Sequence, residues 1–260
     1  MIRFRNIQKS FGGRRVLSGV SFEVQNGQVF FIIGASGVGK SVLIKQLVGL
    51  LHPDVGQIWL DGEEISRLSE TEMYRIRKKC AMVFQHSTLF DSMTCAQNVA
   101  LPLREHTKLE ESTIEIMTKI KLELVGLGGC GDLMPAQLSG GMRKRAGLAR
   151  AMAMDPELIF YDEPSAGLDP IVAAGLDALI RKMQHTFNLT SVVVTHEMAS
   201  VELIADTVCM LKDGRVIGIG NHTEIKAIDH PFVKQFFERR PDEEGVDNES
   251  YISSLTKPGL

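Results

Sequence analysis

A glycine-rich segment at residues 34–41, GASGVGKS, carries the residue types that bind phosphate groups. Its glycines would let backbone N–H groups turn inward around phosphate oxygens. Lys40 would reach the β- and γ-phosphates of a nucleotide, and the hydroxyl of Ser41 would bind Mg²⁺. With glycine at its usual frequency of roughly 7%, a chance match in a chain of this length has a probability of about 1%. The residues assigned to this predicted loop are Gly34, Ala35, Ser36, Gly37, Val38, Gly39, Lys40, Ser41 and Val42.

Two acidic residues, Asp162 and Glu163, end the apolar run LIFYDE, which is typical of a buried strand. Asp162 would hold Mg²⁺, largely through an ordered water. Glu163 would orient the attacking water or accept a proton from it. An acidic pair of this kind is also common at ordinary strand ends, and the phosphate loop upstream is what favours the chemical role.

Three further residues are candidates for the nucleotide site only because the phosphate loop and the acidic pair are also present. Gln85 ends the run MVFQ, and its amide could contact both Mg²⁺ and the attacking water. His196 ends VVVTH, and a neutral imidazole could donate to a γ-phosphate. Phe11, between two strands, could stack on a base. The plainer alternatives are a polar surface residue for Gln85, a structural histidine for His196 and a core aromatic for Phe11.

A second glycine turn, LSGGMRKR at residues 138–145, opens a basic run that favours helix. A small polar residue and two glycines at a helix start form a potential anion-binding turn. Met142 follows them, and its thioether is only a weak hydrogen-bond acceptor. Recognition at this turn would therefore rest on the backbone N–H groups of Gly140 and Gly141.

The elements that must position these residues follow from the apolar pattern. Continuous apolar runs alternate with segments of helical periodicity, which predicts a mainly parallel α/β core. Two alternating runs near the N-terminus predict a small antiparallel β subdomain. The region 86–150 is mostly helical in pattern, with breaks expected at Pro102, at 126–131 and at Pro135. The expected strands are at 2–7, 16–24, 29–33, 56–60, 80–84, 158–162 and 191–195, with a hairpin at 207–220.

The chain changes character from about Asp229. The run HPFVKQFFERR places three phenylalanines at helical spacing, and PDEEGVDNES after it is acidic with few apolar residues. We expect a short amphipathic helix followed by a flexible tail.

The composition bounds the class of protein. The chain has 260 residues, of which 44% are hydrophobic and 23% charged, and a formal net charge of −3. This balance offers no general case for nucleic-acid binding. No apolar run approaches the roughly 20 residues of a membrane span, and Arg3 and Arg5 interrupt the apolar start of any signal peptide. The four cysteines lack CxxC spacing, so we expect a reducing, cytosolic setting.

Six motifs occur in a fixed order over about residues 1–225: GASGVGKS, VFQ, LSGGM, LIFYDEP, SAGLD and VVVTHE. In this order they resemble the ATP-binding subunit of an ABC transporter. The resemblance implies a P-loop NTPase (RecA-like) core with an antiparallel β subdomain and a helical subdomain at about 86–150. It implies an ATP-binding domain at 1–228, with 229–260 as a C-terminal extension. It also implies ATP and Mg²⁺ as cofactors, and Glu163, His196 and Gln85 as catalytic residues, with Gln85 also near the metal.

The resemblance further implies a head-to-tail dimer of two such chains. Each ATP would lie between the phosphate loop of one chain and the LSGG turn of the other. Ser139, Gly140 and Gly141 would then complete the partner's site, and Asp169 of SAGLD would line the dimer seam. Because the γ-phosphate bridges the two chains, hydrolysis would open the dimer.

The segments LFDSMTCAQNVALPLREHT and LSGGMRKRAGLARA are similar to the lipid-transport branch of this family, the Mla-type, MCE-associated ATPases. That branch implies phospholipid cargo, a membrane permease, an MCE-domain lipid-binding protein and a STAS-domain partner. It also implies a position on the cytoplasmic face of the inner membrane.

Three alternatives stay open. The chain could serve another cargo, such as an amino acid or a drug. It could be a soluble ABC ATPase of DNA repair or translation, although it has neither a long coiled-coil insertion nor a second cassette. A phosphate-loop kinase is the third alternative, but a kinase has no use for an LSGG turn.

Overall fold

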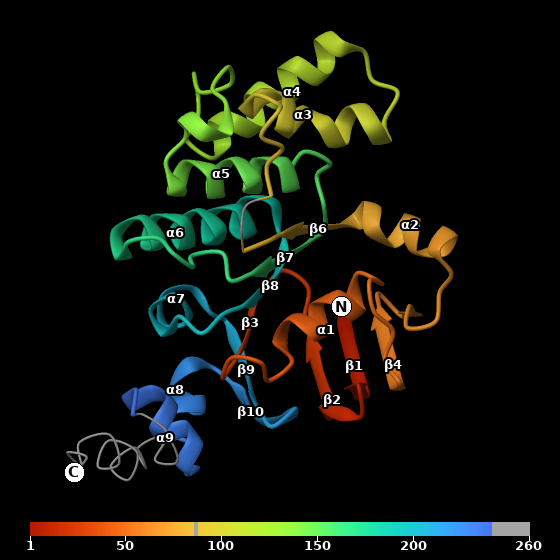
Figure 1. The fold of residues 1–260 in the computed structure, drawn as a ribbon, viewed down its shortest axis with the longest axis vertical. Coiled ribbons are helices and arrows are strands. Elements are labelled where there is room, and N and C mark those ends of the chain that lie inside the picture. Colours follow the sequence, from red (N-terminus) through yellow and green to blue (C-terminus); the bar gives the residue numbers. More distant parts are fainter. Residues whose placement is uncertain (86–87, 241–260) are drawn as a thin grey trace, which may run out of the picture.

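The computed structural model describes residues 1–85 and 88–240, and its largest element is a six-stranded sheet (Figure 1). The strand order is β10-β9-β3-β8-β7-β6, and every neighbouring pair is parallel except β9 with β10. All six residues of β3 are buried, as its unbroken apolar sequence predicts. The expected α/β core is therefore confirmed. The strands are β3 (Val29–Gly34), β6 (Cys80–Val83), β7 (Leu158–Asp162), β8 (Thr190–Val194), β9 (Thr207–Lys212) and β10 (Arg215–Gly220).

The expected antiparallel sheet is also present, with strand order β2-β1-β4-β5. Its apolar face packs toward the main sheet, and three stacked rings join the two. The ring centroids of Phe4 and Phe22 lie 4.5 Å apart, and those of Phe22 and Phe30 lie 5.4 Å apart. Because Phe30 belongs to β3, this stack fixes the small sheet beside the strand that leads into the phosphate loop. The strands are β1 (Ile2–Phe11), β2 (Arg14–Val24), β4 (Val55–Leu60) and β5 (Glu63–Glu64).

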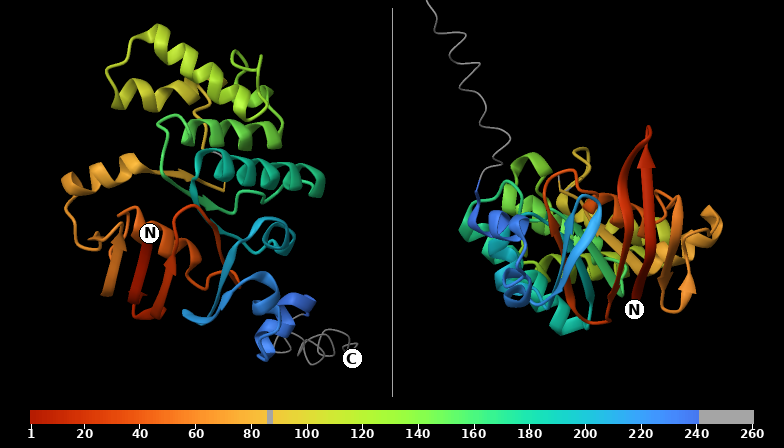
Figure 2. Two further views of the ribbon diagram at one scale, coloured as in Figure 1. Left: turned by 180° about the vertical axis from the view of Figure 1, so that it is seen from behind. Right: turned by 90° about the horizontal axis from the view of Figure 1, so that it is seen from below.

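Helices cover the main sheet and form one end of the molecule. α3 and α4 lie at the end opposite the antiparallel sheet, and α5 lies between them and α6 (Figure 1, and from behind in Figure 2). Whether 86–150 forms a separate unit stays a prediction, and residues 86–87 lie outside the described part of the chain. The bounds of the first seven α-helices are α1 (Lys40–Leu47), α2 (Glu70–Lys79), α3 (Cys95–His106), α4 (Glu111–Leu124), α5 (Gly140–Ala151), α6 (Pro170–Phe187) and α7 (Met198–Ile204).

The expected helix break at Pro102 is wrong, because Pro102 lies inside α3. Proline removes one N–H donor from the helix. Other contacts hold helix α3: a capping box formed by Thr94 and Gln97 closes its start, and Val99 and Leu103, on either side of the proline, are buried. The break among the glycines after α4 is confirmed. Pro135 begins a 3₁₀ turn, where its missing N–H has no partner to lose.

The C-terminal region contains α8 (His222–Lys226) and α9 (Pro231–Glu238). As the phenylalanine spacing predicts, Phe232, Phe236 and Phe237 all pack against the main core, around the buried Val233. The predicted flexible tail falls on residues 241–260, which lie outside the described residues. No helix within residues 1–85 and 88–240 is long and apolar enough to span a membrane.

Candidate functional site

The predicted phosphate loop lies between β3 and α1, in the order strand, glycine turn, helix. Lys40 is buried, and its Nζ donates to the carbonyl oxygens of Gly34 at 2.8 Å and Ala35 at 3.0 Å. Gly39 has φ +106°, and an added Cβ would lie 2.6 Å from Leu17 Cδ2, so only glycine fits there. The loop is therefore wrapped around its own lysine, at the N-terminus of α1.

The pKa of Lys40 is lowered by burial, while the nearby carboxylates of Glu163 and Asp162 act in the opposite direction. Those two carboxylates favour the charged ammonium that binding phosphate requires.

Ser41 and Asp162 meet beside the loop. The Ser41 hydroxyl donates to Asp162 Oδ1 at 3.0 Å, although the two residues are 121 positions apart in the sequence. Mg²⁺ prefers oxygen ligands and is usually held by one or two carboxylates together with substrate phosphates. In the described residues, no group of three or more His, Cys, Asp and Glu side chains could hold a metal. The donor set fits a magnesium ion that shares its coordination with a nucleotide.

Glu163 follows β7 and is held in an unusual backbone conformation. Its φ is +50°, and its N–H donates to the carbonyl of Val194 at 2.8 Å. Its carboxylate accepts a hydrogen bond from Thr195 Oγ1 at 3.0 Å. Non-glycine residues with positive φ cost of order 1–3 kcal/mol and occur where the surroundings impose them, often at functional sites. The end of β8 therefore fixes the carboxylate at the edge of the sheet.

His196 stands next to this carboxylate. Its Nδ1 lies 3.0 Å from Glu163 Oε1, and its side chain is 56% exposed. A neutral ring that donates from Nδ1 has Nε2 as an acceptor. Donation from His196 to a phosphate would therefore require the other tautomer, a ring flip or a second proton.

Gln85 reaches the same edge of the sheet by register. Strands β6 and β7 are parallel, with Val83 opposite Tyr161. Gln85 and Glu163 each follow this pair by two residues, so both lie just beyond the carboxyl ends of neighbouring strands. Strands β3, β8, β7 and β6 thus place the phosphate loop, His196, Glu163 and Gln85 along one carboxyl edge, where ligands bind in open α/β sheets.

The second glycine turn starts α5. Ser139 caps this helix, and its Oγ accepts from the N–H of Met142 at 3.2 Å. Gly141 is packed against α6, because an added Cβ would lie 2.5 Å from Val172 Cγ1. Asp169 caps α6 by accepting from two backbone N–H groups, at 3.0 and 3.1 Å. Helix α5 lies toward α3 and α4, whereas α1 lies beside the antiparallel sheet, so one chain keeps its two turns apart (Figures 1 and 2).

The groove beside the phosphate loop contains residues that sequence analysis missed. It has a volume of about 1150 Å³ and is bounded by residues 35–38, the start of β2, the β9–β10 turn and α9. Arg14, Arg15 and Lys212 supply positive charge there. The two arginines directly after the glycine pair at 12–13 are the sequence signal that could have indicated this positively charged groove.

Phe11 does not line this groove. It is 44% exposed at the end of β1, with Lys9 Nζ 5.4 Å from its ring centroid. Its role in stacking on a base stays a prediction.

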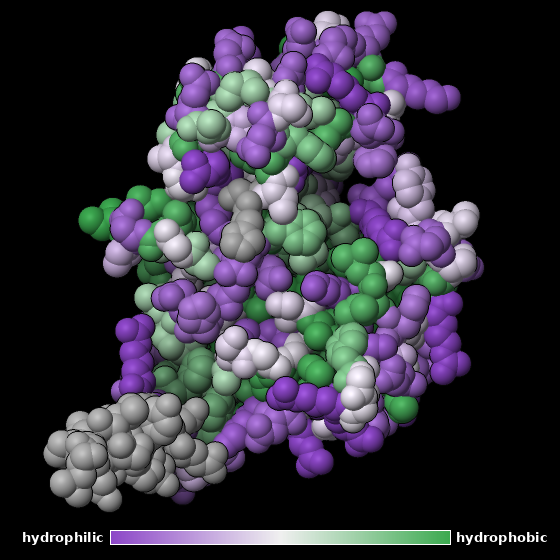
Figure 3. Space-filling model, viewed as in Figure 1, coloured by the Kyte–Doolittle hydropathy of each residue, from purple (hydrophilic) through white to green (hydrophobic). Residues whose placement is uncertain are grey.

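A second groove separates the helical end from the main sheet, and the space-filling view shows this face hollowed between the upper helices and α2 (Figure 3). Its volume is about 330 Å³. Tyr74, Met82, Pro102, His106 and Arg150 are among its lining residues, contributed by α2, β6, α3 and α5. Strand β6, which lines this groove, ends at Val83, two residues before Gln85.

Comparisons with known proteins agree with this geometry. The family described as ABC transporter matches residues 17–166. The intermembrane phospholipid transport ATP-binding protein MlaF of Haemophilus influenzae is 41% identical over 242 residues, which are 93% of this chain and 92% of that protein. A probable ribonucleotide transport ATP-binding protein of Mycobacterium leprae is 40% identical over 257 residues, 98% of this chain and 74% of that protein.

The fold also matches solved structures. A dimeric ATP-binding cassette in a post-hydrolysis state, bound to ADP and phosphate, superposes with a TM-score of 0.78 and 28% identity, covering 85% of this chain and 98% of that chain. The expected P-loop NTPase fold is therefore confirmed. The chain belongs to the ABC transporter family, as one of its ATP-binding subunits.

Proposed function

We propose that this chain hydrolyses ATP to power the movement of phospholipid between bacterial membranes. The observation that carries the cargo is the match to MlaF, which extends over more than nine tenths of both chains. Such a match includes the helical region and not only the nucleotide motifs. The ribonucleotide named for the M. leprae relative is the competing cargo, and an amino acid or a drug remains a further alternative.

The site geometry supports hydrolysis by a positioned water. The loop N–H groups and Lys40 bind the phosphates, and Ser41 and Asp162 would hold Mg²⁺. The ion would neutralise charge developing on the β- and γ-phosphate oxygens. Glu163, fixed by Thr195, accepts the proton of the attacking water. Gln85, just beyond the end of the neighbouring strand β6, orients that water.

Two chains would share each nucleotide. The N–H groups at the start of α5, from Gly140 and Gly141, would bind the γ-phosphate on the partner's loop, with Ser139 beside them. Asp169 would lie in the seam. Two observations support this arrangement: the separation of the two turns within one chain, and the dimer formed by a structurally similar cassette. Loss of the γ-phosphate on hydrolysis would release the dimer.

The groove between α2, β6, α3 and α5 is the proposed dock for the integral membrane permease. It offers aromatic and apolar surface from Tyr74, Met82 and Pro102. Docking there would hold the chain at the cytoplasmic face of the inner membrane.

We further propose an ATP-binding domain at 1–228, with a helical subdomain at 86–150. An extension at 229–260 would contact a neighbouring ATPase and a STAS-domain partner. An MCE-domain lipid-binding protein would complete the system, and nucleic acid has no part in it.

The test is a purification of the chain with its permease in mild detergent, followed by mass spectrometry of retained lipids and proteins. The complex is then reconstituted between labelled donor and unlabelled acceptor vesicles. We expect ATP-dependent transfer of labelled phospholipid, lost in the Glu163→Gln variant. ATP-dependent transport of a ribonucleotide, an amino acid or a drug in place of phospholipid would refute the proposed cargo.

A further inference from the structure

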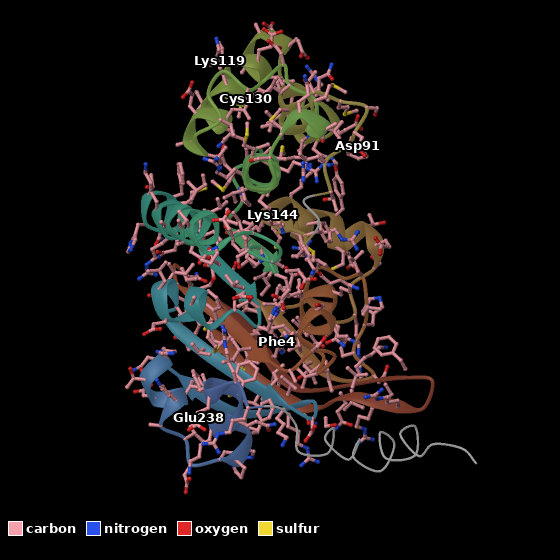
Figure 4. The ribbon with its side chains drawn as sticks, turned by 60° about the vertical axis from the view of Figure 1, so that its left-hand side comes forward. Phe4, Asp91, Lys119, Cys130, Lys144 and Glu238 are labelled. Carbon is pink, nitrogen blue, oxygen red and sulfur yellow. The ribbon has the colours of Figure 1, made fainter. Side chains whose placement is uncertain are left out.

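Lys144 is a buried cation that sequence analysis did not single out. It lies on α5 and is 6% exposed, and its Nζ donates to the backbone carbonyl of Gln85. Figure 4 shows it where α5 faces the main sheet, far from Lys119 at the helical end. A buried ammonium costs several kcal/mol unless its hydrogen bonds compensate. Here the hydrogen bond to the Gln85 carbonyl, at the edge of the sheet that carries the candidate catalytic residues, offsets part of this cost.

A carboxylate lies within electrostatic reach of this ammonium. The pKa of Lys144 is lowered by burial, and Glu163 acts in the opposite direction. Lys144 therefore contacts the backbone of Gln85 by a hydrogen bond, and the charge of Glu163 favours its ammonium form.

Helix α5 holds the segment after β6 at a second point. The guanidinium of Arg150 donates to the carbonyl oxygen and to Oγ1 of Thr88, both at 2.9 Å, and lies 5.7 Å from the ring centroid of Phe90. Thr88 has φ +40°, an unfavourable value for a β-branched residue. Backbone strain of this kind persists only where neighbouring groups impose it. Gln85, Thr88 and Phe90 therefore all take their position from contacts with α5.

The start of α5 connects this contact to the second nucleotide. Lys144 is four residues after Gly140, on the same face of the helix. In the proposed dimer, the turn at Gly140 and Gly141 binds the partner's ATP, whereas Gln85 and Glu163 act on this chain's own ATP. A shift of α5 when the turn engages a γ-phosphate would move the Lys144 ammonium, and with it the backbone of Gln85.

We propose that Lys144 is a positioning residue that links the two ATP sites of the dimer, so that occupancy of one site sets the water-handling groups of the other. This inference rests on the proposed dimeric ATPase. It predicts that Lys144 determines cooperativity between the sites more than the affinity of either one.

The test compares variants in the complex with the permease. Lys144→Met keeps the length of the side chain and removes its charge and donors, Lys144→Arg keeps both, and Lys119→Met on the exposed face of α4 is the matched control. ATPase rate is measured against ATP concentration, with nucleotide affinity measured separately by a fluorescent ATP analogue. A two-site dimer allows a Hill coefficient between about 1 and 2.

We expect Lys144→Met to bring the Hill coefficient to about 1 and to lower kcat about tenfold, with affinity for the analogue changed less than about twofold. Lys144→Arg should restore most of both values, and Lys119→Met should match the wild type. A wild-type Hill coefficient of 1, or an unchanged coefficient in Lys144→Met, would overturn the inference.

If Lys144→Met does not fold, Lys144→Gln supplies the same readout. Loss of the fold in both variants would assign a structural role to Lys144 and would also overturn the inference. Absence of ATPase activity in the wild-type complex would instead contradict the proposed function.

Discussion

Replacing Glu163 with glutamine is the sharpest test of the proposed chemistry. General-base catalysis contributes about 10²- to 10⁴-fold, so Glu163→Gln should raise the activation free energy by about 3 to 5 kcal/mol. Stability should change little. The amide oxygen can still accept from Thr195 Oγ1, and the cost of φ +50° is the same for both side chains. The change is limited to about one hydrogen bond, roughly 1 kcal/mol, or a shift in melting temperature of about 2–4 °C.

The assay is phosphate release by the permease complex at saturating ATP and Mg²⁺, with nucleotide binding and ATP-induced dimerisation measured in parallel. Binding should be preserved, and a closed dimer should accumulate because its γ-phosphate persists. Glu202→Gln, an exposed residue of α7, is the matched control and should leave kcat unchanged. A kcat within about threefold of the wild type would remove Glu163 from the role of base, since such a loss is about 0.7 kcal/mol.

Three further outcomes follow from the packing. Burial raises the pKa of Asp177, which accepts a hydrogen bond from Ser200 Oγ at 2.7 Å. The folded chain then binds this proton more tightly than the unfolded chain, so Asp177 lowers stability as pH rises above about 4. Asp177→Asn should therefore raise the melting temperature at pH 8 and much less at pH 4; equal gains at both would contradict this sign. In Gly141→Ala, the added methyl group should clash with Val172, lower the free energy of unfolding by about 1–3 kcal/mol and lower kcat while nucleotide affinity is preserved. Adding Val172→Ala in the same chain should recover part of both losses, which melting and ATPase assays can measure. Truncation after Asp229 should reduce recovery with the permease more than nucleotide affinity, and equal recovery of both chains by co-purification would oppose it.

Much of the fold was predictable because its signals are local. The unbroken apolar run of β3, the glycines after it and the helical periodicity of α1 lie within twenty residues of one another. The Asp-Gly pair at 213–214 predicts the β9–β10 hairpin, and both residues indeed have positive φ. The candidate site follows from the same logic, since parallel strands bring their carboxyl ends to one edge.

The rest depends on contacts between distant segments. Nothing in the sequence near Lys144 indicates that it ends at a carbonyl 59 residues earlier. The pairing of Asp177 with Ser200 is hidden in the same way, because each looks like an ordinary polar helical residue. At Pro102 the local rule gave a wrong prediction. Proline favours a helix break, but packing on both sides of Pro102 keeps α3 intact.

The position of β3 in the main sheet has a consequence for synthesis on the ribosome. Phe30 pairs with Val192 on one side and with Thr207 on the other, so both neighbours of this strand are translated more than 160 residues after it. At about 5–20 residues per second, the nascent strand waits roughly 8 to 32 s for its first partner. During that time one of the most apolar segments of the chain has no sheet to enter, which makes it a target for chaperones and for aggregation. Nucleotide can assist the folding of this strand only after β8 and β9 have been translated.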